Sequence, residues 1–245
     1  MKRLLLSALG ALLILAVTGV AVLVEDVDNI PDSPSVQVIV AEQMIDVPVL
    51  CQYPTLPTGC ELVAATMVLR YYGDGIAAED FARDWLSCRD GFYRSGGRLY
   101  GPNPEKVFVG DPFIKASYGC FEGPIVQAVN GHSEACVAEA VVGRSLPSLC
   151  EEYIDRDHPL LVWVTMGMAE PREGSSWHLE DGSLFTWTAG EHCMVLVGYT
   201  STHYLFNDPM TGEVAAYEKA LVEACYTRLG RRAVHIYELK RGMLP

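Results

Sequence analysis

The sequence contains no pair of cysteines spaced as C-x-x-C, the arrangement from which most structural zinc sites are built. Its cysteines are spaced irregularly instead: Cys51, Cys60, Cys88, Cys120, Cys136, Cys150, Cys193 and Cys225. Outside the cytoplasm some of them could form disulfides, but their spacing leaves every pairing open. A zinc framework is therefore not expected, and the sequence predicts neither a metal site nor a cofactor.

Basic residues are few in this chain. There are 18 lysines and arginines against 31 aspartates and glutamates, which gives a formal net charge of −13 at pH 7. Such a surface repels the phosphate backbone of nucleic acids as well as anionic lipid headgroups. Nucleic acid is therefore excluded as a partner, and the simplest role of the excess acidic charge is to keep the protein soluble.

Charge is absent from one stretch near the N-terminus. Lys2 and Arg3 precede residues 4–24, which carry no charge, and Glu25 follows directly. As a helix this stretch would be about 30 Å long, enough to cross the hydrocarbon core of a membrane. The pattern predicts a single-pass anchor in the cell membrane, with the remainder of the chain outside. The alternative is a signal peptide cleaved after Ala21, which would make the protein secreted.

The chain after residue 24 shows no internal repeats, and half of all residues in the sequence are hydrophobic. This composition suffices to bury one large core. We therefore expect residues 25–45 to form a linker with a short strand at 36–40, and residues 46–245 to form a single domain. The oligomeric state is left open.

A turn and an apolar helix surround Cys60. Pro57 and Gly59 favour a turn, and residues 62–69 are apolar on nearly all sides, as is typical of a buried helix. Cys60 is then expected at the helix N-terminus, where the macrodipole and unpaired N–H groups favour a thiolate. Gln52, across the turn, could donate its side-chain amide to an oxyanion alongside the Cys60 N–H. The more common role of a lone cysteine is that of a small buried hydrophobic residue.

A β-hairpin is predicted in the C-terminal half. Residues 191–200 (EHCMVLVGYT) form a strong strand pattern, and residues 204–207 run back before Asp208. His192 opens the first strand and Asp208 ends the second, so both can lie at the same edge of the sheet. Together with Cys60 they provide the residue types of a Cys-His-Asp triad. A polar residue at a strand end is the more common role of a lone histidine.

Two further cysteines adjoin these candidates. Cys51 precedes Gln52 and Cys193 follows His192. Because neighbouring strand residues point to opposite faces, Cys193 is turned away from His192, and both cysteines are interpreted as packing residues. The same alternation disfavours a zinc site made of His192, Cys193 and Asp208.

The remaining helices, strands and loops are predicted from hydrophobic periodicity and from turn residues. Helices are predicted at 76–86, from near 124, at 146–155 and at 217–229, strands at 160–166, 185–188 and 233–239, and loops at 88–112 and 168–182. The first loop is rich in glycine, proline and aromatic residues. Loops of that length usually carry function.

Three segments, QYPTLPTGCELVAATMVL, GEHCMVLVGY and NDPMTG, resemble the papain-like cysteine peptidases related to bacteriocin-leader-processing domains (peptidase family thirty-nine), particularly their stand-alone exported relatives. The similarity covers residues 47–236. It implies an α+β fold in which a central helix carrying the cysteine packs on an antiparallel half-barrel sheet. It also implies that Cys60 is the nucleophile, His192 the base, Asp208 the residue orienting the base, and Gln52 the oxyanion-hole glutamine. The chain lacks the transporter segments and the ATP-binding motif that accompany true leader-processing domains.

These features predict an exported, membrane-tethered thiol hydrolase that cleaves peptide bonds in peptide or protein substrates at the cell surface. Two other classes of protein stay open. One is a non-catalytic surface module that binds peptide or cell wall, although such a module needs no nucleophile, base and oxyanion donor together. The other is a transferase or amidase that acts on a non-peptide amide.

Overall fold

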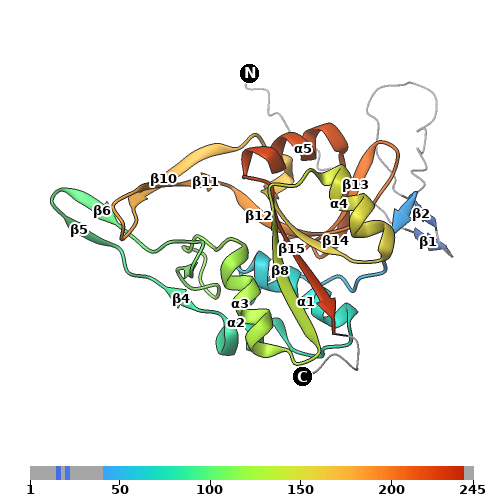
Figure 1. Ribbon diagram of the computed structural model, residues 1–245, viewed down its shortest axis with the longest axis horizontal. Coiled ribbons are helices and arrows are strands. Elements are labelled where there is room, and N and C mark those ends of the chain that lie inside the picture. The colour runs from blue at the N-terminus through green and yellow to red at the C-terminus, as the bar shows by residue number, and fades with distance from the viewer. Residues whose placement is uncertain (1–14, 18–19, 23–40, 240–245) are drawn as a thin grey trace, which may run out of the picture.

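The computed structural model describes residues 15–17, 20–22 and 41–239 (Figure 1). Its main element is a seven-stranded sheet with the order β14-β13-β12-β9-β15-β8, in which β3 also pairs with β12. The bounds of these strands are β3 Gln43–Met44, β8 Cys136–Val142, β9 Leu160–Thr165, β12 Glu191–Tyr199, β13 His203–Asp208, β14 Glu213–Glu218 and β15 Arg232–Glu238. All pairings within this sheet are antiparallel.

The core lies around β9 and β12. Every residue of β9 is buried, and β12 is buried from Glu191 to Gly198. Strands that are covered on both faces are continuous hydrophobic runs, which is why both were predictable from sequence. The indole N–H of Trp163, which is fully buried, donates a hydrogen bond of 2.9 Å to the carbonyl of Cys120 and so joins β9 to the segment before α3.

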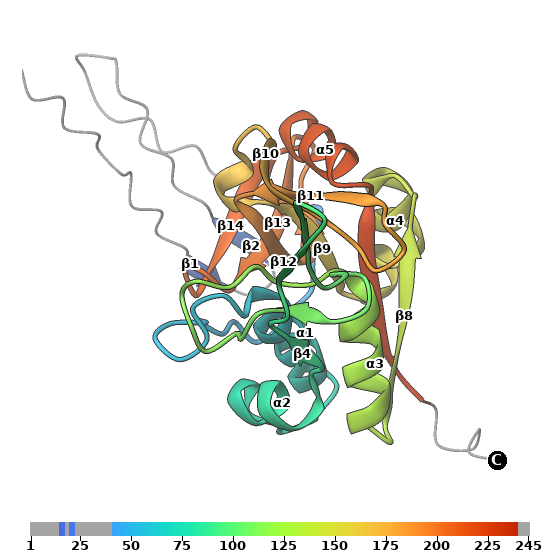
Figure 2. The same ribbon diagram turned by 90° about the vertical axis from the view of Figure 1, so that its left-hand side faces the viewer.

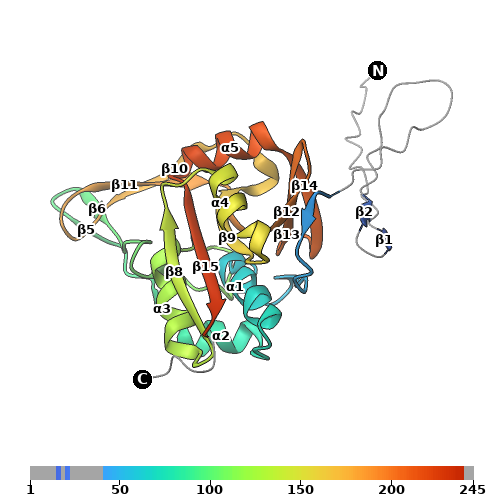
Figure 3. The same ribbon diagram turned by 45° about the vertical axis from the view of Figure 1, so that its right-hand side comes forward.

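Helices cover both sides of this sheet. Their bounds are α1 Cys60–Tyr71, α2 Ala78–Trp85, α3 Glu122–His132, α4 Leu146–Glu152 and α5 Lys219–Arg228. Figure 2 shows α1, α2 and α3 together on one side, with α5 on the other. Figure 3 shows the paired strands β8 and β15 running side by side. Helix α1 begins at Cys60 as predicted, and its residues are buried as far as Leu69.

A smaller sheet extends from the body of the molecule (Figure 1). It has the order β11-β10-β6-β5, with bounds β5 Tyr93–Ser95, β6 Arg98–Tyr100, β10 Arg172–His178 and β11 Leu184–Ala189. The short strands β4 (Cys88–Arg89) and β7 (Phe108–Val109) pair separately. The predictions of loops at 88–112 and at 168–182 are therefore wrong. Most of β10 is exposed, so this strand has no apolar period and is held by backbone pairing with β11.

The predicted membrane anchor requires a correction. No helix among the described residues is long and apolar enough to cross a membrane. Within the proposed anchor, Leu15–Val17 (β1) and Val20–Val22 (β2) are short strands that pair antiparallel, and an extended pair cannot be part of one continuous spanning helix. The single-pass localisation is therefore wrong for these residues. The rest of the predicted anchor and the strand predicted at 36–40 lie outside the described residues, and the domain boundaries stay predictions.

Candidate active site

A cavity of about 440 Å³ lies where the start of α1 meets the start of β12. Three of the four predicted site residues, Gln52, Cys60 and His192, contribute to its wall. Asp208 does not line the cavity, but it contacts His192 from the protein interior. The structure thus brings all four predicted residues to one place, from the turn before α1, from the first residue of α1 and from the β12–β13 hairpin.

His192 and Asp208 form a buried pair. The His192 Nε2 to Asp208 Oδ1 distance is 2.7 Å, and the two side chains are 2% and 1% exposed. The same oxygen also accepts the backbone N–H of Met210 at 2.8 Å, which fixes the carboxylate. Because Asp208 occupies Nε2, the other ring nitrogen of His192, Nδ1, is the one left to exchange a proton.

The environment of Cys60 differs from the one expected at an exposed helix end. The thiol is only 6% exposed, and its Sγ donates a hydrogen bond of 3.3 Å to Glu61 Oε2. Burial raises the pKa of the Cys60 thiol well above its usual value, and the nearby carboxylates of Glu61 and Glu191 raise it further. The expected preference for a thiolate is therefore wrong for this arrangement, since burial and two acidic neighbours outweigh the partial positive charge of a helix terminus.

Glu61 and Glu191 are the residues that sequence reasoning missed. Glu61 is fully buried, and its Oε1 accepts the backbone N–H of Cys120 at 2.8 Å. Glu191 is 6% exposed, and its Oε1 has no hydrogen-bond partner among the described residues. Burial raises the pKa of both carboxyl groups, and the charge of Glu61 raises that of Glu191 further. Their positions in the sequence could have identified them, because Glu61 follows Cys60 and Glu191 precedes His192 within otherwise apolar elements.

Gln52 is held at the wall of the cavity by the turn that it begins. Its backbone N–H donates to the carbonyl of Pro209 at 2.8 Å, and its carbonyl accepts the N–H of Leu56 at 2.8 Å. Its side-chain Nε2 donates to the carbonyl of Pro57 at 3.0 Å. An amide nitrogen carries two hydrogens, so one remains available to a substrate.

Cys51 and Cys193, which lie next to Gln52 and His192 in the sequence, do not change this description of the site. All eight cysteines of the chain lie in the described part and none forms a disulfide. Cys193 is fully buried, whereas Cys51 is exposed, so the packing role predicted for Cys51 is wrong. In the part of the chain that the structure describes, His192, Cys193 and Asp208 do not form a group that could hold a metal.

The sequence model of the Peptidase_C39 like family matches residues 44–234. The chain belongs to this family. Among solved structures, a C39-like peptidase from Bacillus anthracis is 25% identical with a TM-score of 0.70, over 82% of this chain and 98% of that one. The peptidase domain of Streptococcus ComA, a bi-functional ABC transporter involved in a quorum sensing pathway, is 14% identical with a TM-score of 0.46, over 78% of this chain and 97% of that one. No curated protein sequence matches.

These comparisons confirm two of the predictions made from sequence. The protein is a cysteine peptidase of the C39-like family, and it has the α+β fold of such peptidases. A peptide or protein is accordingly its substrate.

Proposed function

We propose that this C39-like peptidase cleaves peptide bonds with Cys60 as nucleophile, His192 as general base and Asp208 as the residue that orients His192. Gln52 supplies the side-chain donor of the oxyanion hole. The observation that carries this proposal is the buried 2.7 Å bond between His192 and Asp208, because His192 lines the same cavity as Cys60 and Gln52. This combination provides a nucleophile, a base and an orienting group in one site.

The thiol must lose its proton for catalysis. In the resting arrangement that proton is directed to Glu61, so the thiol has to turn toward Nδ1 of His192 before attack. Negative charge at Glu61 opposes a thiolate at Cys60, but it also attracts a protonated His192. The Cys60 proton is therefore expected to pass to Nδ1 of His192 as the sulfur attacks, and not to be lost beforehand.

The acyl-transfer steps follow from these positions. Cys60 Sγ attacks the carbonyl carbon of the scissile amide, and the oxyanion receives hydrogen bonds from the Cys60 N–H and Gln52 Nε2. His192 then gives its proton to the leaving amine, and a thioester to Cys60 remains. Water, deprotonated by His192, hydrolyses the thioester and restores the thiol.

Replacement of Gln52 tests the oxyanion hole. Gln52→Ala is expected to lower kcat by about 10²-fold or more, because one preorganised donor is lost. Gln52→Glu preserves the size of the side chain but replaces the amide with a carboxylate, so it should be at least as damaging. Steady-state kinetics on a quenched fluorescent peptide measure both. Full activity of Gln52→Ala would remove this residue from the site.

Two different replacements of Asp208 separate the orientation of His192 from the negative charge beside it. Its Oδ1 alone accepts both the His192 bond and the Met210 N–H bond, and an asparagine oxygen can do the same. Asp208→Asn should therefore retain much more activity than Asp208→Ala, which is expected to lower kcat by about 10²-fold or more. Both variants should remain better than Cys60→Ala. Equal losses in Asp208→Asn and Asp208→Ala would show that the negative charge, and not orientation, is what His192 requires.

A further inference from the structure

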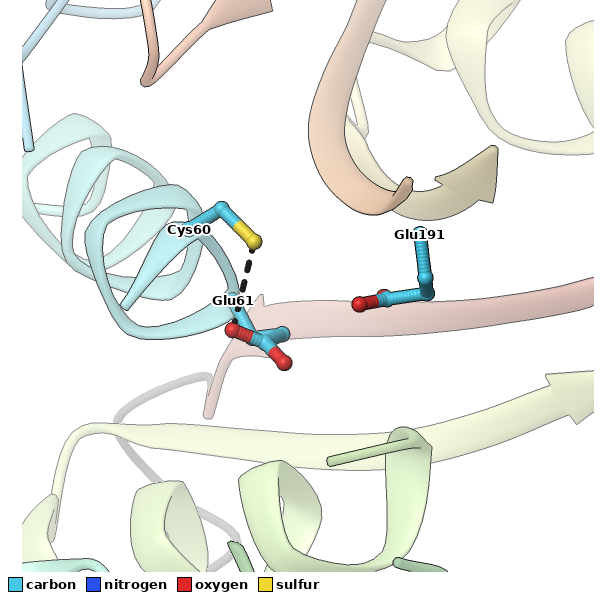
Figure 4. A group of neighbouring side chains, drawn as sticks. All are labelled: Cys60, Glu61 and Glu191. Atoms are coloured by element: carbon cyan, nitrogen blue, oxygen red, sulfur yellow. Dashed lines mark hydrogen bonds between the residues drawn. The ribbon is translucent and has the colours of Figure 1, made fainter. Parts of the chain in front are cut away.

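Three buried side chains converge beside the nucleophile. One ligand atom from each of Cys60, Glu61 and Glu191 lies within 4.8 Å of the other two, and Figure 4 shows the Glu191 carboxylate directed at the other pair. These residues are 6%, 0% and 6% exposed, and Glu191 Oε1 lacks a hydrogen-bond partner among the described residues. We propose that they bind one borderline-soft divalent cation such as Zn²⁺, and that this cation reversibly blocks the peptidase.

The donor set selects the class of cation. Thiolate sulfur favours zinc and similar transition metals, whereas Mg²⁺ and Ca²⁺ prefer sites made of oxygen alone. Zinc also binds carboxylate oxygen and accepts a water as its fourth ligand. One thiolate and two carboxylates, open to a cavity on one side, meet these requirements.

The distances fit such an ion. Zinc bonds of about 2.3 Å to sulfur and about 2.0 Å to oxygen in a tetrahedral site would place the two ligand atoms about 3.5 Å apart. Cys60 Sγ and Glu61 Oε2 are 3.3 Å apart. These two ligands are thus already spaced for one ion, and a rotation of the Glu191 side chain would bring in the third.

The surroundings hold the Glu61 carboxylate in place. Its Oε1 accepts the Cys120 N–H at 2.8 Å, which leaves Oε2 directed at the sulfur. A hydrogen bond to the second oxygen is the usual support of a metal-binding carboxylate. Gly119 lets the backbone pass close by, since a Cβ at this position would lie 2.5 Å from Glu61 Oε1 and 3.4 Å from Glu191 Oε2.

Charge also favours a cation. Two carboxylates and a thiol are buried beside one another, and each negative charge there disfavours the others. Among the residues that line the cavity, Lys115 carries the one permanent positive charge. A divalent ion entering through the cavity, whose wall includes Cys60 and Glu191, would compensate the carboxylates directly.

Zinc bound to the Cys60 sulfur would block the peptidase reaction. A sulfur bound to zinc cannot attack a carbonyl carbon, so the loaded enzyme would be inactive until the metal is removed. This consequence rests on the proposed role of Cys60 as nucleophile, whereas binding of the metal does not. The two claims can therefore fail separately.

Binding is tested by equilibrium dialysis of the reduced full-length protein against Zn²⁺ alone. The difference between wild type and Cys60→Ala isolates zinc at this site from zinc on other thiols. We expect one zinc per chain in that difference, and at least about 10-fold weaker binding in Glu61→Gln and in Glu191→Gln. Glu134→Gln, at an exposed position, is the matched control and should bind as wild type does. Wild-type affinity in Glu191→Gln would overturn the proposal, because a Cys60–His192 zinc site would not require this carboxylate.

A measurement on the wild-type protein removes any dependence on the folding of variants. X-ray absorption of the protein loaded with one equivalent of Zn²⁺ should show one sulfur at about 2.3 Å and an oxygen shell at about 2.0 Å. Imidazole scattering in place of two carboxylates would overturn the assignment. Absence of stoichiometric binding would also overturn it. Dialysis and absorption need no turnover, so a failure of hydrolysis would not be mistaken for a failure of this site.

Discussion

Replacing Cys60 with alanine is expected to reduce hydrolysis of peptide substrates by about 10⁴-fold or more, because the acyl-enzyme pathway is lost with the sulfur. His192→Ala should cause a loss of similar size, since nucleophile and base act as a unit. A quenched fluorescent peptide library, read as kcat/KM for the best substrate, measures both.

Cys88→Ser provides the control for the first prediction. Cys88 is an exposed thiol on β4 and does not line the cavity, so its loss should leave kcat/KM near that of wild type. Substantial activity in Cys60→Ala would contradict the proposed mechanism. Loss of activity in Cys88→Ser as well would indicate damage to the fold and not to the site.

The largest effect on stability is expected at Trp163. This side chain is fully buried in β9 and its N–H bonds to the Cys120 carbonyl, so Trp163→Ala creates a cavity and leaves that carbonyl without its donor. The free energy of unfolding should fall by about 3–5 kcal/mol. Urea unfolding followed by circular dichroism measures this difference.

Trp85→Ala is the matched control, because Trp85 lies at the end of α2 and is 42% exposed. Its replacement should cost less than half as much free energy of unfolding. Since Cys120 also donates its N–H to Glu61, Trp163→Ala should also disturb the arrangement of Glu61 and Glu191. A loss at Trp163 no greater than that at Trp85 would contradict the assignment of β9 to the centre of the core.

A zinc-dependent block would give this peptidase a second state. The residue that attacks the substrate would also be the residue that binds the metal, so activity would depend on how much free zinc the protein meets. Burial raises the pKa of the resting Cys60 thiol, and the same two glutamates raise it further. In the absence of the metal, their negative charges oppose a thiolate at Cys60.

Local sequence patterns were sufficient for the helix and the hairpin that carry the site. The turn at Pro57 and Gly59 and the apolar run after it place Cys60 at the first residue of α1. The apolar runs at 191–200 and 204–207 and the turn between them place His192 and Asp208 at one edge of the sheet. Such features are predictable because they depend on neighbouring residues and on the period of a helix or strand.

Other features depend on segments that are distant in sequence. β10 is polar and mostly exposed, so only its pairing with β11 makes it a strand. The pKa of Cys60 was expected to fall, but burial and two carboxylates raise it. Residues 15–17 and 20–22, although apolar, form paired strands and not part of a spanning helix. In each case the outcome depends on which distant residues pack against the segment or the side chain. Hydrophobicity or local position alone does not specify those residues.

The sequence by itself determined the family, the α+β fold and the four residues proposed for catalysis, because these follow from motifs that are each continuous along the chain. Only the tertiary structure decided that Glu61 and Glu191 meet beside Cys60. One residue comes from the start of α1 and the other from the start of β12, and packing of the helix on the sheet brings them together. The electrostatic field at Cys60 is set by this packing, since the energy between charges depends on their distance in space and on the water excluded around them.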